Sequence, residues 1–194
     1  FHGEGGIGII SSRLTLEGPI IKEKSSFIVS GRRTYIDVLA KPFINPESRF
    51  AGSGYYFYDL NAKANYRLGD KDRFFLSGYF GRDVFNLHGN QPGSPSFKIP
   101  WGNATVTGRW NHLFSPKLFL NTTAVVSDYK FAFGGGQDQF GFSLKSGIRD
   151  YGLKLDFNQY PTIRHNLRYG AQYTYHIYTP STVAVNSADV DFNI

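Results

Sequence analysis

Polar and apolar residues alternate without interruption in two stretches of the chain, residues 58–68 and 167–177. In the first, Tyr58, Leu60 and Ala62 fall on one side of an extended chain, and Asp59 and Asn61 fall on the other. This period of two predicts β-strands with one apolar and one polar face. Further strands are expected at residues 9–17, 25–35, 73–84, 101–113, 118–130 and 142–157, although the alternation is weaker in the last two. The chain therefore predicts about eight strands, and no segment has the periodicity of a helix.

The predicted connections alternate in length. Short connections, with Gly, Pro, Asp and Ser, are expected at 17–25, 69–72, 114–117 and 158–164. Long connections are expected between them, at 36–54, 85–100, 131–141 and after residue 178. Short turns at one end and long loops at the other are typical of outer-membrane β-barrels, with periplasmic turns and extracellular loops.

Aromatic residues lie near both predicted ends of the strands. Tyr66, Phe74, Trp110 and Phe157 are next to short turns, and Tyr35, Tyr58, Tyr129 and Tyr178 are near the long loops. Two such sets are expected at the two interfaces of a membrane. The alternative is a soluble sandwich or lipocalin-like barrel with the apolar face turned to a core, but soluble strands usually run about 5–6 residues.

Composition narrows the class of protein. The chain has 194 residues with 21 Lys and Arg, 15 Asp and Glu, and no Cys. The positive charges are scattered, which argues against a nucleic-acid surface. No apolar run approaches the ~20 residues of a membrane helix, but a transmembrane strand needs only ~9–11 residues. We expect the sequence to begin partway through a precursor, because it opens inside a glycine-rich segment.

Residues 3–12, GEGGIGIISS, contain the spacing G-x-G-x-x-G of a dinucleotide-binding loop. That motif requires a strand before it, a helix after it and an acidic residue about 20 positions later. Here a strand pattern follows, and residues 25–33 contain no carboxylate. The glycines are therefore not expected to bind a nucleotide.

Enzymatic chemistry is not indicated by the sequence. The five histidines lack the spacing of a zinc site, and no nucleophile motif occurs. Asp59 with Asp83, or Asp150 with Asp156, could be imagined as paired acids, but solvated strand carboxylates are far commoner. We expect no enzyme activity, no cofactor and no metal.

Several segments together resemble one protein family. They are residues 11–20 (SSRLTLEGPI), 26–35 (SFIVSGRRTY), 56–66 (YFYDLNAKANY), 74–83 (FFLSGYFGRD), 101–103 (WGN) and 109–112 (RWNH). In this order they resemble the first barrel strands of TonB-dependent outer-membrane transporters, most closely the Bacteroidetes-type receptors. The resemblance covers roughly residues 5 to 180.

The resemblance implies an all-β antiparallel transmembrane β-barrel of about 22 strands, of which this chain supplies about eight. Residues 1–8 would connect a plug to the barrel, 9–180 would form its first strands, and 181–194 would be an extracellular loop or the start of the next strand. The implied function is energy-coupled uptake of a metal chelate, glycan or peptide across the outer membrane of a Gram-negative bacterium. Implied partners are outer-membrane lipid, the inner-membrane TonB complex, reached through an N-terminal part, and a surface lipoprotein. No nucleic-acid partner is expected.

Candidate substrate contacts come from the predicted lumen face and from the loops. The lumen candidates lie toward the extracellular strand ends: Arg32, Asp59, Asn61, Asp83 and Asn103. The loop candidates are Tyr55, Tyr56, Phe85, His88 and Gln91. A plain ladder of cross-strand charges with no ligand is the alternative interpretation of the lumen set.

Two other architectures stay open at this point. A self-contained eight-stranded outer-membrane barrel with a structural or adhesive role would pair residues 9–17 with 165–178. A soluble ligand-binding barrel would bury Tyr58, Leu60, Tyr66, Tyr169 and Tyr173.

Overall fold

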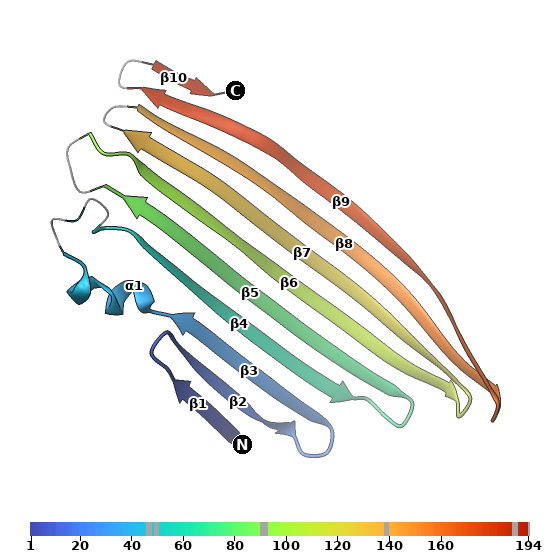
Figure 1. The fold of residues 1–194 in the computed structure, drawn as a ribbon. Coiled ribbons are helices and arrows are strands. Elements are labelled where there is room, and N and C mark those ends of the chain that lie inside the picture. Colours follow the sequence, from blue (N-terminus) through green and yellow to red (C-terminus); the bar gives the residue numbers. More distant parts are fainter. Residues whose placement is uncertain (46–47, 49–50, 90–92, 138–139, 188–189, 194) are drawn as a thin grey trace.

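The chain folds into one antiparallel sheet whose strands follow each other in chain order (Figure 1). The computed structural model describes residues 1–45, 48, 51–89, 93–137, 140–187 and 190–193. The strands are β1 (His2–Ile7), β2 (Ser11–Ile21), β3 (Ser25–Thr34), β4 (Gly54–Arg67), β5 (Asp72–His88), β6 (Ser96–Ser115), β7 (Leu118–Gln137), β8 (Phe140–Thr162), β9 (His165–Ser187) and β10 (Val190–Asn193). The link from β3 to β4 carries the short helices α1 (Ile36–Leu39) and η1 (Lys41–Phe43). Among the described residues, no helix is long and apolar enough to span a bilayer.

Every predicted strand is present, but the later strands are longer than predicted. The segment 131–141 was expected to be a loop, and this expectation is wrong for its described part, because β7 continues to Gln137. Gly134 to Gly136 pair with β8, and β9 continues to Ser187 instead of ending near residue 178. The connection from β3 to β4 spans residues 35–53, and the connection from β5 to β6 spans residues 89–95. The ends of β7 and β8 are extended because their backbone groups form hydrogen bonds with neighbouring strands, and the local sequence does not show this pairing.

Residues 2–7 also form a strand. β1 pairs with β2 from His2 opposite Glu17 to Ile7 opposite Ser12. The glycine-rich segment is therefore the first strand of the sheet, where we expected only a connection, and no helix follows it.

The sheet does not close on itself within the described residues. β2 pairs with β1 and β3, and β9 pairs with β8 and β10. In Figure 1 the first and last strands lie at opposite edges. The pairing of residues 9–17 with 165–178, which a closed eight-stranded barrel requires, does not occur.

The pairing register gives the sheet two chemically different faces. One row across six strands consists of Ala64, Leu76, Gly108, Ala124, Leu153 and Tyr173. We call this side the apolar face. A row on the other side consists of Asn61, Tyr79, Thr105, Ser127, Asp150 and His176, and we call it the polar face. The alternation seen in single strands is thus kept in register across the sheet.

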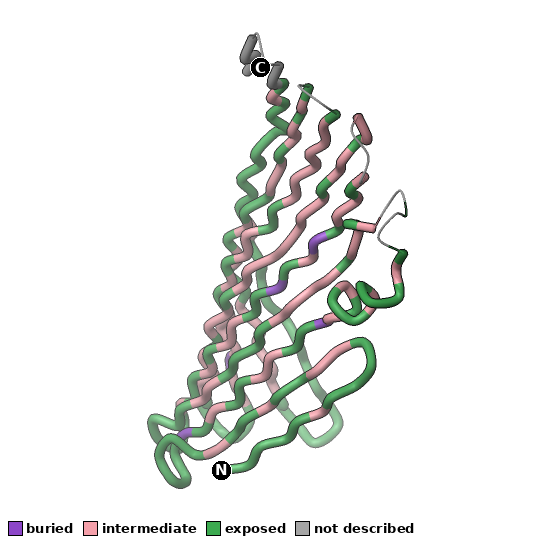
Figure 2. The backbone as a smooth tube through the Cα atoms, turned by 90° about the vertical axis from the view of Figure 1, so that its left-hand side faces the viewer, coloured by how far each residue is buried: buried purple, intermediate pink, exposed green. Residues whose placement is uncertain are grey.

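The sheet is a single layer with almost no core. Among the described residues, only Val84 and Leu120 are buried apolar side chains, and Figure 2 shows intermediate or exposed residues along nearly the whole backbone. Leu60 is 50% exposed and Tyr173 is 68% exposed. The burial that a soluble barrel would require is therefore absent from the described residues. Since burial of apolar surface is the main term that offsets chain entropy, the described sheet by itself gains little of this stabilisation.

The aromatic residues next to the short turns share the apolar face. Tyr66 lies opposite Phe74, which lies opposite Trp110. Trp110 stacks on Phe74 with ring centroids 6.2 Å apart, and its Nε1 donates to Asp72 at 2.8 Å. Trp110 thus packs its apolar ring on a neighbouring ring while its N–H group has a hydrogen-bond partner.

The second expected aromatic set is split between the two faces. Tyr58 belongs to the apolar face, where its ring lies 6.0 Å from that of Phe80. Tyr129 and Tyr178 are two residues from Ser127 and His176, on the polar face. A single aromatic girdle of these residues at the loop end was therefore a wrong expectation.

Candidate functional site

Two predicted site residues form an ion pair on the polar face. Arg32 of β3 lies directly opposite Asp59 of β4. Its Nε and Nη2 atoms donate to the same Oδ2 atom of Asp59 at 2.9 and 2.7 Å. The guanidinium carbon also lies 4.8 Å from the centre of the Phe57 ring. Asp59 is held tightly, with a side chain that is 11% exposed, whereas half of the Arg32 side chain faces solvent.

A second pair lies near the loop end of the same face. The Tyr55 hydroxyl donates to Asp83 Oδ1 at 2.5 Å. Tyr55 also stacks on Trp101 of β6, with ring centroids 6.2 Å apart and planes inclined by 22°. This hydrogen bond, together with partial burial and the charge of Asp83, raises the pKa of the Tyr55 hydroxyl to about 12. The tyrosine is therefore a neutral donor at physiological pH.

Asn61 and Asn103 complete the predicted lumen set. Asn61 follows Asp59 by two residues, so both belong to the polar face. Asn103 lies opposite Gly81 on β5, and its Oδ1 accepts from Ser127 Oγ at 3.0 Å. All five lumen candidates therefore share one face of β3 to β6.

The predicted loop contacts are strand residues instead. Tyr55 and Phe85 lie opposite each other in β4 and β5, and His88 is the last residue of β5. Tyr56 belongs to the apolar face, because it lies opposite Val84, and the Arg33 guanidinium lies 5.9 Å from its ring centre. The ladder continues beyond the alternating part of the sequence, so these residues were wrongly assigned to loops. Gln91 lies outside the described residues.

Trp101 was not among the candidates predicted from the sequence. It lies opposite Asp83 and stacks on Tyr55, so it belongs to the same surface as Asp59 and Asp83. Its place two residues before Asn103 was the available signal, since both must point the same way in a strand.

The assembled surface suits non-covalent binding of a polar solute. Aromatic faces of Tyr55, Phe57 and Trp101 lie beside the Arg32 guanidinium and the Asp59 and Asp83 carboxylates. Aromatic rings can pack against the flat, weakly polar faces of a solute, and charged side chains can form hydrogen bonds that fix its orientation. No cluster of His, Cys, Asp or Glu in the described part of the chain has the make-up of a metal site.

A search of protein-family models found no match to this chain, and a search of curated proteins found none either.

Proposed function

We propose that this chain is the N-terminal part of the barrel of a TonB-dependent outer-membrane transporter, which takes up a nutrient in an energy-coupled manner. The observation that carries the proposal is the open, coreless sheet with one apolar and one polar face. Lipid would cover the apolar face, and the polar face would line the lumen.

The height of the apolar band supports this placement. On β8 the apolar face runs from Phe157 through Leu153 to Tyr151, and the next residue on that face is Arg149. The eight residue steps from Phe157 to Arg149 span about 26 Å along the strand. A tilt of about 40° reduces this to about 20 Å, against an apolar band of about 25 Å in known outer-membrane barrels.

The open edges and the polar face support a large barrel. Unpaired edges in lipid leave backbone groups without partners, so further strands must complete the sheet. Barrels of about 22 strands enclose a lumen wide enough for a plug. In the proposed protein, a plug fills this lumen, and the TonB complex acts on a segment before the plug. A surface lipoprotein is the proposed partner on the loop side.

Uptake by whole cells tests this function. A deletion strain is complemented with the full-length gene and given a radiolabelled ferric chelate, a fluorescent oligosaccharide or a fluorescent oligopeptide. We expect one of these probes to enter only in complemented cells and to be excluded when a protonophore collapses the proton gradient. Uptake of all three that does not depend on the gene or on the gradient would contradict the proposal.

Variants of the polar face refine the same assay. Arg32→Ala removes the guanidinium beside Phe57 and leaves Asp59 unpaired, so we expect uptake to fall about tenfold or more. Arg109→Ala removes the same group from the turn half of the polar face, where it lies 4.6 Å from the Phe75 ring centre. This control should retain uptake.

A further inference from the structure

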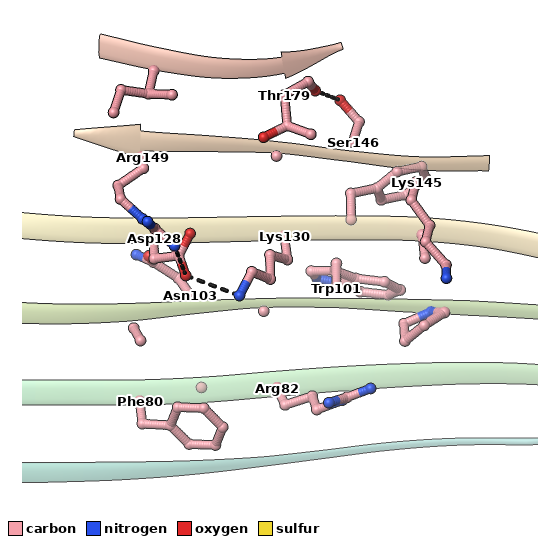
Figure 3. A pocket seen from close by; sticks show the side chains of 18 residues that line it. Phe80, Arg82, Trp101, Asn103, Asp128, Lys130, Lys145, Ser146, Arg149 and Thr179 are labelled. Carbon is pink, nitrogen blue, oxygen red and sulfur yellow. Dashed lines mark hydrogen bonds and ion pairs between the residues drawn. The ribbon is translucent and has the colours of Figure 1, made fainter. Parts of the chain in front are cut away.

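A groove of about 520 Å³ lies on the apolar face at the loop end of β5 to β9 (Figure 3). Its lower row consists of Phe80, Ala104, Asp128, Arg149 and Ile177, which the register aligns across five strands. The next row, toward the loops, consists of Arg82, Gly102, Lys130, Gly147 and Thr179. The groove therefore begins where the uncharged part of the apolar face ends.

The groove is strongly cationic. Arg82, Lys130, Lys145 and Arg149 line it together with one carboxylate, that of Asp128. Asp128 Oδ2 lies 3.0 Å from Lys130 Nζ and 3.3 Å from Arg149 Nη2, as the dashed lines in Figure 3 mark. Within the described residues, no carboxylate lies within ion-pair distance of Arg82 or Lys145. The site therefore presents more positive charge than its own carboxylate neutralises.

Two glycines keep the floor of the groove open. A Cβ atom on Gly102 would lie 2.6 Å from the Gly81 carbonyl oxygen, and one on Gly147 would lie 2.9 Å from the Tyr129 carbonyl oxygen. Neither position accepts a side chain without moving a neighbouring strand. Arg82 and Lys130 lie on either side of Gly102, so their backbones are about 10 Å apart and no side chain stands between them.

Charge on the apolar face is distributed unevenly between its two ends. The loop end also carries Arg33 and Lys98, whereas the turn end carries Asp72, which accepts from Trp110 and pairs with His112. Between them, the row of Leu76, Leu153 and its neighbours is uncharged. The positive loop end of this face would suit the anionic head of an amphiphile, and the uncharged rows below it would suit its apolar chains.

We propose that this groove binds the phosphate head group of an outer-leaflet lipid, with the acyl chains of that lipid on the apolar band below. Guanidinium and ammonium groups form short charge-assisted hydrogen bonds to phosphate oxygens. Arg82 and Lys145 are the primary phosphate contacts, because no carboxylate of the described residues competes for them. Asp128 holds Lys130 and Arg149 over the lower edge of the groove. This inference rests on the proposed membrane placement of the apolar face.

Lipid binding to the full-length protein tests the inference. The protein in detergent is titrated with phosphorylated lipid A and with the same lipid after removal of its phosphates, and bound lipid is counted by native mass spectrometry. We expect the phosphorylated form to bind at least about tenfold more tightly. Arg82→Gln with Lys145→Gln should abolish this preference. Lys63→Gln with Arg73→Gln removes equal charge from the polar face and should retain it.

The remaining outcomes distinguish a lipid site from a site for free phosphate. Equal binding of the two lipid forms would overturn the inference, as would complete displacement of the lipid by inorganic phosphate at millimolar concentration. In vesicles, a spin label at Leu153→Cys reports whether the band lies in lipid. A label in lipid without phosphate preference would refute only the head-group site. A label in water would refute both the site and the proposed membrane placement.

Discussion

Leu153→Arg is the sharpest test of what covers the apolar face. Leu153 lies midway between the aromatic row at the turn end and Arg149, and it is 49% exposed in the isolated sheet. If this face were in water, replacing a half-exposed leucine would change the free energy of unfolding by about 0.5 kcal/mol or less. In the middle of a bilayer, the same arginine costs about 2–4 kcal/mol. That is a loss of about 30- to 700-fold in the folding equilibrium.

The assay is guanidinium unfolding of the full-length protein from lipid vesicles. Thr174→Arg is the matched control, because Thr174 lies beside Tyr173 in β9 but on the polar face, opposite Gly152. We expect the control to unfold within about 0.5 kcal/mol of wild type. Equal, small effects of both substitutions would refute the assignment of the apolar face to lipid.

Three further predictions concern packing, pH and the turn end of the sheet. Gly102→Ala places a Cβ 2.6 Å from a carbonyl oxygen of the adjacent strand, so it should lower the free energy of chemical unfolding by about 1–3 kcal/mol. Gly108→Ala is the control, because a Cβ at Gly108 meets nothing within 4 Å, and this change should be neutral or stabilising. Because the pKa of the Tyr55 hydroxyl is raised to about 12, its contribution to the free energy of unfolding is complete below about pH 10 and is lost as the pH rises to about 12. Tyr55→Phe has no such hydroxyl, so its free energy of unfolding should fall less than that of wild type over this pH range. Trp110→Phe keeps the stacked ring but removes the donor to Asp72, so unfolding should become easier by about 1 kcal/mol, and no change would refute a structural role for that bond.

The two-faced sheet was predictable because its signal is local. A strand such as β4 shows the alternation of Tyr58, Asp59, Leu60 and Asn61 in its own sequence, and pairing then had only to preserve the parity. The shared face of Arg32, Asp59 and Asn103 followed from the same rule. These parts of the fold needed no knowledge of the neighbouring strands.

The strand ends toward the loops were not predictable by this rule. Glycines at 134–136 carry no side chains, so they give no alternation, and their extended form depends on partners in β6 and β8. The parity of Trp101 with Asn103 gave its face, but its stacking on Tyr55 depends on the pairing of β4, β5 and β6, which the sequence of one strand does not show.

The weak alternation in residues 118–130 and 142–157 has two causes in the structure. Asp128, Lys130 and Arg149 are charged residues on the apolar face, and Val125 and Ile148 are apolar residues on the polar face, so both sets break the expected pattern. The three charged residues line the cationic groove. The charged exceptions to the pattern therefore lie at the site at which we propose a lipid head group binds.

Site-directed spin labelling along β4 tests the central claim most directly. The sequence contains no Cys, so a single cysteine can be placed in turn at positions 58 to 67 of this segment and labelled in lipid vesicles. We predict that collisions with oxygen are frequent at even positions, including Leu60 and Ala64, and that collisions with a water-soluble nickel complex are frequent at odd positions, including Asn61. Access of the nickel complex to both faces, or the reverse alternation, would contradict a sheet with one face in lipid and the other in an aqueous lumen.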